Sequence, residues 1–151
     1  MMSLKIEKMT SSHIGEIAKL EKECFSSPWS EDGLKSEINN KFARFFVAFS
    51  NGKIVGYVGS HNVLGEVYIT NVAVLPEFRR KGIGKAIVEL LVNEMKAEGA
   101  DFVTLEVRKS NSNAISLYEK CGFQKVGERK DFYERPREDG ILMTYFLGDN
   151  L

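Results

Sequence analysis

The spacing of apolar residues divides the first third of the chain into a strand, two helices and a hairpin. Residues 4–9 (LKIEKM) alternate between apolar and polar positions as a strand does. Apolar residues then recur at helical spacing, at Ile14, Ile17, Leu20 and Cys24. A second short helix is expected after the sequence SSPW, with Ser30 as its N-terminal cap.

The central part of the sequence predicts an antiparallel pair followed by a further strand. Residues 43–49 (ARFFVAF) and 53–63 (KIVGYVGSHNV) flank Asn51-Gly52, a dipeptide typical of two-residue hairpin turns. Residues 66–75 (EVYITNVAVL) then read as a strand that ends at Pro76. These segments therefore predict consecutive strands of one sheet.

Two helical patterns and three strands follow. The first helix is marked by Ile83, Ile87, Leu90, Leu91 and Met95 and stops at Gly99. The second is marked by Ala114, Leu117, Tyr118 and Cys121 and is ended by Gly122. Strands are predicted at 102–107, 123–130 and 140–147. This order predicts an α/β fold with a mixed sheet and helices on its faces, and without a repeat or linker we expect one domain, 1–151.

Composition limits the classes of partner. The chain has 151 residues, 43% of them apolar, and 21 basic against 21 acidic side chains, so neither nucleic acid nor an anionic membrane is an expected partner. Cys24 and Cys121 form no CxxC pair and His13 and His61 add no cluster, so we expect no metal site. No apolar run approaches ~18 residues and the start has no signal-peptide core, so we expect a cytoplasmic protein.

Positive charge gathers where one of the predicted helices begins. The stretch 79–91 (RRKGIGKAIVELL) places cations and two glycines at a helix N-terminus, which already carries roughly +0.5 of an elementary charge. No Ser, Thr, Asp or Asn stands between Arg79 and Lys85 to cap the free N–H groups. An external anion would satisfy both the charge and the unpaired donors.

The glycine loop differs from the two common phosphate-binding motifs. A Walker loop requires glycine where Arg79 stands and Ser or Thr where Ala86 follows Lys85. A dinucleotide fingerprint would fit Gly82 and Gly84 but requires a third glycine at Ile87. What remains is R-x-x-G-x-G between a strand and a helix. On the loop alone, a pyrophosphate cradle and a glycine-bearing turn with solvated basic side chains are equally good interpretations.

Two longer segments resemble a known family. The segments 71–91 (NVAVLPEFRRKGIGKAIVELL) and 105–123 (LEVRKSNSNAISLYEKCGF) resemble the two signature motifs of the GNAT superfamily of acetyl-CoA-dependent N-acetyltransferases. The segments 24–38 (CFSSPWSEDGLKSEI) and 129–145 (RKDFYERPREDGILMTY) look like its bacterial RimI type, whose members acetylate the N-terminal alanine of a ribosomal small-subunit protein. The resemblance implies a GNAT fold with mostly antiparallel N-terminal strands and a splayed central parallel pair.

The resemblance also implies how acetyl-CoA binds. The backbone of one strand would hold the acetyl and pantetheine portion, the glycine loop would cradle the pyrophosphate, and an asparagine would contact the cofactor arm. The residues concerned are Val72, Ala73, Val74, Arg79, Arg80, Lys81, Gly82, Ile83, Gly84, Lys85 and Asn111.

Two residues match the catalytic positions of the family. Strand alternation places Glu106 opposite Val103, Leu105 and Val107, on a face that is either solvated or covered. The resemblance makes Glu106 the general base that takes a proton from the acceptor amine, and Tyr118 the general acid for the departing CoA thiolate. From spacing alone Tyr118 fits an apolar helix face equally well. The oxyanion would be stabilised by the N–H of Val74, and Cys121 is better explained as a buried thiol than as a nucleophile.

Peptide recognition is assigned to two aromatic residues. The resemblance places Trp29 and Tyr133 beside the peptide entrance, although each is also a plausible core anchor. Relatives often carry two adjacent tyrosines where this chain has Phe132 and Tyr133, so one expected hydroxyl is missing. The predicted function is direct transfer of acetyl from acetyl-CoA to a protein N-terminus, with a ribosomal protein as the expected partner. The alternatives are acetylation of a small amine or a lysine, and acyl-CoA binding without catalysis.

Overall fold

A mixed sheet runs through the computed structural model, which describes residues 3–148. Its strands are β1 (Leu4–Lys8), β2 (Ala43–Ser50), β3 (Lys53–Val63), β4 (Glu66–Val74), β5 (Phe102–Arg108), β6 (Gln124–Glu134) and β7 (Arg137–Phe146). Their spatial order is β1-β2-β3-β4-β5-β7-β6. β4 and β5 are parallel, and the other neighbouring pairs are antiparallel. The outermost residues of the predicted domain, 1–2 and 149–151, lie outside the described residues.

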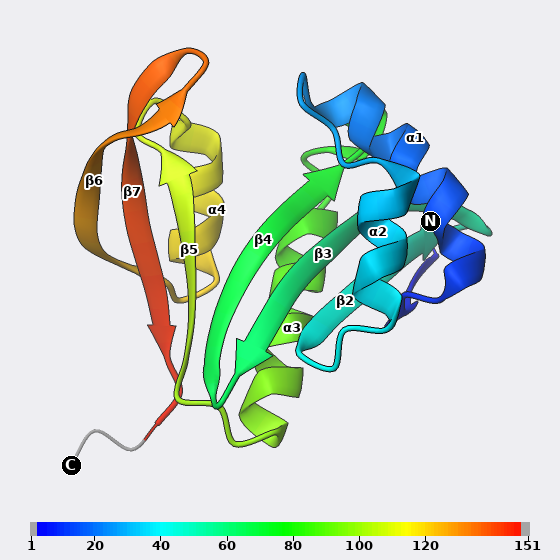
Figure 1. Ribbon diagram of the computed structural model, residues 1–151, viewed down its shortest axis with the longest axis horizontal. Coiled ribbons are helices and arrows are strands. Elements are labelled where there is room, and N and C mark those ends of the chain that lie inside the picture. Colours follow the sequence, from blue (N-terminus) through cyan, green and yellow to red (C-terminus); the bar gives the residue numbers. More distant parts are fainter. Residues whose placement is uncertain (1–2, 149–151) are drawn as a thin grey trace.

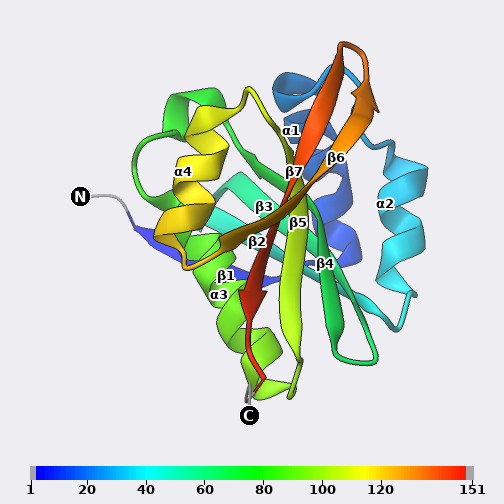
Figure 2. The same cartoon turned by 90° about the vertical axis from the view of Figure 1, so that its left-hand side faces the viewer.

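Helices cover both faces of this sheet. The helices α1 (Ile14–Cys24) and α2 (Glu31–Ile38) lie on one face, and α3 (Ile83–Ala97) and α4 (Ser112–Lys120) lie on the other (Figure 2). Short 3-10 turns, η1 (Ser11–His13) and η2 (Pro76–Phe78), precede α1 and follow β4. The predicted order of elements and the α/β fold class are confirmed. Ser30 caps α2 as predicted, because its hydroxyl accepts a hydrogen bond from the Gly33 N–H at 3.1 Å.

The two faces have separate cores. Residues of α1 and α2 pack with Phe45, Val47, Tyr57 and Ala73 of the sheet. A larger core, on the other face, joins the apolar sides of α3 and α4 to the central strands. A residue's face in the sheet therefore decides which helices it meets.

A bulge in β4 changes which side chains share a face. Gly59 is paired with Asn71 and Ser60 with Ile69, so Thr70 is an extra residue on β4. Without it, Ile69 and Asn71 would point to the same face. Instead, Ile69 lies in the core under α3, whereas Asn71 contacts Glu21 of α1. The bulge thus brings Asn71 to the α1 face.

β4 and β5 separate beyond this point. Their pairing covers only Glu66–Tyr68 against Phe102–Thr104. Farther along, β4 pairs only with β3, and residues 105–108 of β5 pair only with β7. The two strands diverge toward the end of the molecule that holds the α1–α2 connection and the tip of the β6–β7 hairpin (Figure 1). This opening, between 69–74 of β4 and 105–108 of β5, is called the wedge below.

The last two strands are longer than predicted. β6 continues to Glu134 and β7 begins at Arg137, so Phe132 and Tyr133, which lie outside the predicted strands, belong to a hairpin. The sequence pattern did not extend this far because a register shift between Arg129 and Tyr133, with Asp131 at a φ of 55°, interrupts the strand alternation of β6.

In the part of the chain from Ser3 to Gly148, no helix combines the length and apolar character that a membrane crossing requires.

Candidate active site

Glu106 lies at the wedge with its carboxylate almost fully covered. Its side chain is 3% exposed and points away from the core that holds Val103, Leu105 and Val107, so the predicted alternation is confirmed. The Tyr68 hydroxyl donates a hydrogen bond to Oε1 at 3.0 Å. The other oxygen, Oε2, is buried and has no hydrogen-bond partner among residues 3–148. A buried acceptor without a donor is costly, which marks it as a place for an incoming N–H group.

Two phenols beside this carboxylate hold their protons tightly. Burial, followed by the negative charge of Glu106, raises the pKa of Tyr68 from 10 to about 12. The pKa of Tyr133 is also raised, mainly by burial and then by Glu106, and the Arg108 guanidinium opposes the rise. Both hydroxyls are therefore neutral donors at physiological pH.

Arg108 fixes the hairpin that carries Tyr133. Its guanidinium lies 4.4 Å from the centre of the Tyr133 ring and donates hydrogen bonds to the carbonyls of Pro136 and Arg135, at 2.8 and 3.1 Å. A further hydrogen bond, of 3.3 Å, reaches the Glu138 carboxylate. These contacts tie the tip of the β6–β7 hairpin to the end of β5. Tyr133 is consequently held close to Glu106.

Tyr118 is part of the core under α4. The residue is 8% exposed, and its ring centre lies 5.8 Å from that of Phe123. Burial is the main cause of a raised pKa of the Tyr118 phenol, and nearby Cys121 and Tyr133 add to it. This position fits both a core aromatic and a general acid, because the Tyr118 ring can pack in the core while its hydroxyl donates a hydrogen bond.

The strand expected to hold the acetyl portion has free backbone on its wedge side. The Leu75 N–H bonds to Val55 of β3, and alternation along a strand therefore turns the backbone groups of Val74 and Val72 toward the wedge. The Val74 carbonyl accepts a hydrogen bond from Arg79 Nε at 2.9 Å, and Cys24 Sγ lies 3.5 Å from it. Ala73 faces the α1 core, so its side chain is directed away from α3.

The start of α3 has the predicted lack of a cap. Gly82 occupies the N-cap position at a φ of 81°, without a side-chain hydrogen bond, and the first turn has no acidic residue. A Cβ added to Gly82 would meet nothing within 4 Å, so the space above the helix end is open. The Ile83 side chain is buried in the core, so only its N–H is directed outward. The exposed cations around this helix end are Arg79, Arg80, Lys81 and Lys85.

Two other predicted residues have a structural task as well. The Asn111 side chain caps α4, accepting a hydrogen bond from the Ala114 N–H at 3.1 Å. Trp29 packs against Phe45 with ring centres 6.0 Å apart, and the Trp29 backbone N–H donates to the Glu21 carboxylate at 2.9 Å. Trp29 is therefore a partial core anchor on the α1 side of the sheet.

Sequence reasoning missed several polar residues on this face. Tyr68 and Arg129 contact Glu106, and Arg129 Nε lies 3.6 Å from its Oε2. Glu21, 1% exposed, accepts a 2.5 Å hydrogen bond from the Tyr57 hydroxyl. An apolar strand pattern surrounds Tyr68 on β4, whereas Glu21 lies on α1 and Arg129 on an exposed strand, where no such signal was available. The bulge at Thr70 hid which of them share a face.

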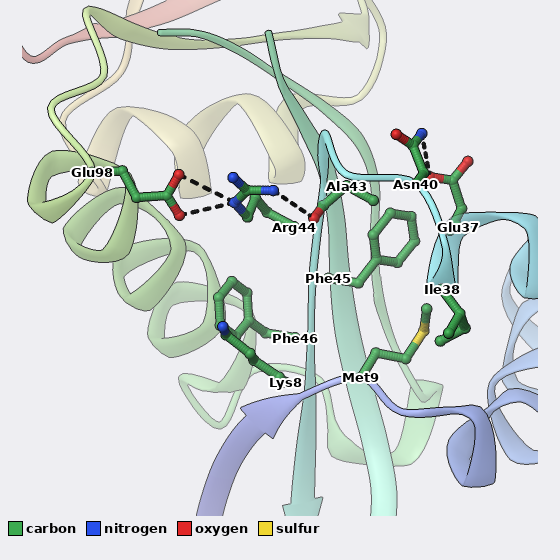
Figure 3. A pocket seen from close by; sticks show the side chains of 10 residues that line it. All are labelled: Lys8, Met9, Glu37, Ile38, Asn40, Ala43, Arg44, Phe45, Phe46 and Glu98. Carbon is green, nitrogen blue, oxygen red and sulfur yellow. Dashed lines mark hydrogen bonds and ion pairs between the residues drawn. The ribbon is translucent and has the colours of Figure 1, made fainter. Parts of the chain in front are cut away.

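A hollow of about 260 Å³ lies elsewhere, between β2 and the ends of α2 and α3 (Figure 3). The ion pair of Arg44 and Glu98, with 2.8 Å between Nε and Oε2, lies at its edge. None of the residues predicted to bind or react with a substrate lines it. The residues predicted to bind or react with a substrate lie instead around the wedge and the start of α3.

Comparisons with known proteins concern the family and the fold of the chain. A family model described as "Acetyltransferase (GNAT) family" matches residues 14–123. The [ribosomal protein bS18]-alanine N-acetyltransferase of Escherichia coli K12 is 33% identical, covering 92% of this chain and 95% of the relative. The enzyme of that name from Haemophilus influenzae is 32% identical, covering 94% and 98%.

Solved structures show the same fold. The crystal structure of the ribosomal-protein-S18-alanine N-acetyltransferase from Escherichia coli superposes with a TM-score of 0.89 at 32% identity, over 99% of each chain. Arabidopsis thaliana NAA60 in complex with acetyl-CoA has a TM-score of 0.85 at 20% identity, over 96% and 99% of the two chains, which is a likeness of fold alone.

Proposed function

The chain belongs to the acetyltransferase (GNAT) family, and from this premise we propose that it acetylates the N-terminal alanine of ribosomal protein bS18, with acetyl-CoA as the donor. The observation that carries the proposal is the buried Glu106 carboxylate beside the opened strands, one oxygen of which has no hydrogen-bond partner within residues 3–148. The names of relatives that match almost the whole chain support the choice of acceptor.

The residues around the wedge and the start of α3 fit acetyl-CoA. Acetyl-CoA supplies an acetyl group activated as a thioester. The backbone of Val72 and the N–H of Val74, which turn toward the wedge, would offer hydrogen bonds to an extended pantetheine, as the free edge of a strand does. The uncapped N–H groups of α3, the open space over Gly82 and the nearby cations suit a pyrophosphate. Asn111 would contribute its free amide nitrogen.

Glu106 would act as the base for the acceptor amine. An α-amine with a pKa near 8 is mostly protonated at neutral pH and must lose a proton before it can attack a carbonyl. Oε2 of Glu106 is the free acceptor for that proton, while Tyr68 holds Oε1. The N–H of Val74 would stabilise negative charge on the carbonyl oxygen.

Tyr118 would act as the general acid that protonates the departing CoA thiolate. Its raised pKa keeps the phenol protonated at physiological pH, so the hydroxyl is available to donate to the departing sulfur. Trp29 and Tyr133 stand on the two sides of the wedge, on the α1–α2 connection and on β6, and would flank the acceptor peptide. This arrangement admits a chain terminus from the outer end of the sheet.

The test is a product analysis on competing amines. Purified protein with acetyl-CoA would be offered an Ala-starting peptide with the bS18 N-terminal sequence, the same peptide with a blocked terminus and an added lysine, and a polyamine. Mass spectrometry is expected to find the acetyl group on the α-amine of the first peptide. Faster turnover of the lysine or polyamine would contradict the acceptor assignment. Binding of acetyl-CoA without transfer to any of these amines would mean that the protein binds acyl-CoA without catalysis.

A further inference from the structure

The Glu106 carboxylate faces a cation supplied by a different part of the sheet. Arg129 of β6 places its Nε 3.6 Å from Oε2, whereas the carboxylate side chain is 3% and the arginine side chain 58% exposed. The separation is too long for a hydrogen bond, and Oε2 has no other partner among residues 3–148. The guanidinium therefore offsets the negative charge of the Glu106 carboxylate but donates no hydrogen bond to Oε2.

The path from β6 to Glu106 crosses β7 at a glycine. Gly140 is paired with Arg129 on one side and with Arg108 on the other. A Cβ at Gly140 would lie 3.2 Å from the Cβ of Phe132, so Phe132 packs directly over this glycine. The Arg129 guanidinium also lies 5.8 Å from the centre of the exposed Phe132 ring. That ring gives the guanidinium an alternative contact when it leaves Glu106.

We propose that Arg129 is a positioning residue that holds Oε2 of Glu106 in the free protein and is displaced by the ammonium of the acceptor. Both groups are cations that donate N–H bonds, so they compete for the same acceptor atom. Arg129 thus occupies the approach to the buried carboxylate until the acceptor arrives, and lowers the apparent affinity for that acceptor. The inference rests on the proposed function.

The other polar groups near Glu106 cannot take this role. Tyr68 of β4 already bonds Oε1, and Tyr133 of β6 is a neutral phenol. Arg108, two residues along β5, is held by the hairpin carbonyls and by Glu138. Of these groups, Arg129 combines a positive charge, an exposed side chain and a loose contact with Oε2.

Kinetics of Arg129→Gln test the competition. With an Ala-starting peptide at pH 8, the acceptor KM of Arg129→Gln is expected to fall about threefold while kcat stays within about twofold. This is the scale expected for the loss of one exposed ion pair. Arg129→Lys keeps the charge and should keep the wild-type KM. Lys130→Gln removes a neighbouring exposed charge and should change neither KM nor kcat.

A measurement without turnover separates this inference from the proposed function. Carboxyl carbon NMR of the free protein at pH 8, with the Glu106 signal assigned by its loss in Glu106→Gln, reports the surroundings of the carboxylate directly. A displaced Glu106 signal in Arg129→Gln but not in Lys130→Gln supports the ion pair, even if no protein N-terminus is acetylated. An unmoved Glu106 signal in Arg129→Gln, or a KM that rises in this variant while peptides are still acetylated, would overturn the role of Arg129 alone.

Discussion

The Tyr68 hydroxyl lies 3.0 Å from Oε1 of Glu106, and this hydrogen bond joins β4 and β5 where their backbone pairing ends. Tyr68 is the last β4 residue paired with β5, opposite Thr104. Glu106 lies two residues farther along β5, where the strands have begun to diverge. The pair therefore holds a carboxylate at the mouth of the wedge.

Tyr68→Phe removes this donor and keeps the ring. We expect kcat/KM for an Ala-starting peptide to fall about tenfold, the usual scale of a hydrogen bond to a charged group. Because the pKa of Tyr68 is raised to about 12, the phenol stays protonated through pH 10, so the loss should be constant between about pH 6 and 9. Tyr145→Phe, on β7, is the control. A loss that disappears within this pH range would contradict the assignment.

The same raised pKa has a consequence for stability. The folded protein holds the Tyr68 proton more tightly than an unfolded chain with a pKa of 10 does. The corresponding stabilisation is complete below pH 10 and is lost as the pH rises toward 12.

Tyr118→Phe separates packing from catalysis. The change keeps the buried ring and removes the hydroxyl, so acetyl-CoA affinity and thermal stability should largely survive. If the hydroxyl serves the leaving group, kcat should fall by about 10²-fold. Calorimetry of acetyl-CoA binding and steady-state kinetics measure the two effects. Wild-type turnover in Tyr118→Phe would show that Tyr118 has only a structural role.

Two glycines with matching backbones test the pyrophosphate cradle. Gly82 has a φ of 81° and Gly52, in the β2–β3 turn, a φ of 83°, and an added Cβ meets nothing within 4 Å at either position. Valine at either site should therefore cost a similar amount of stability, about 1–2 kcal/mol, from left-handed strain. Only Gly82→Val should weaken acetyl-CoA binding. Equal affinities of the two folded variants would argue against the cradle.

The sequence was sufficient for the order of elements because their ends carry local signals. Asn51 and Gly52 have φ values of 50° and 83°, as a hairpin turn of this kind requires, and Gly99 and Gly122 end their helices with positive φ. The uncapped start of α3 was also readable, since it depends on which residue types are absent. Local chemistry decides such features, so no long-range information was needed.

Contacts around Glu106 depend on features that local patterns do not encode. The bulge at Thr70 places Asn71 on the α1 face, and a register shift in β6 brings Arg129 and Tyr133 near a carboxylate on β5. Both are irregularities of strand pairing, whose position depends on the partner strand. The sequence could therefore nominate Glu106 and Tyr133 but not Tyr68 or Arg129.

Glu106→Gln should penalise an α-amine substrate most at low pH. Deprotonating a lysine ε-amine at pH 7 costs about 4–5 kcal/mol, whereas an α-amine with a pKa near 8 costs about 1–1.5 kcal/mol. A single carboxylate base is sufficient to deprotonate the α-amine, for which this free-energy cost is the smaller one. As the pH rises through the α-amine pKa, solvent supplies the neutral amine, and the gap between wild type and variant should narrow.

The measurement is a pH–rate profile of wild type and Glu106→Gln on an Ala-starting peptide, with Glu128→Gln on exposed β6 as a control for the loss of one negative charge. The control should follow wild type at every pH, because Glu128 bonds lysines rather than facing the wedge. A gap that widens with pH would mean that Glu106 does not accept the amine proton. A Glu106→Gln variant equal to wild type at low pH would remove this carboxylate from the reaction altogether.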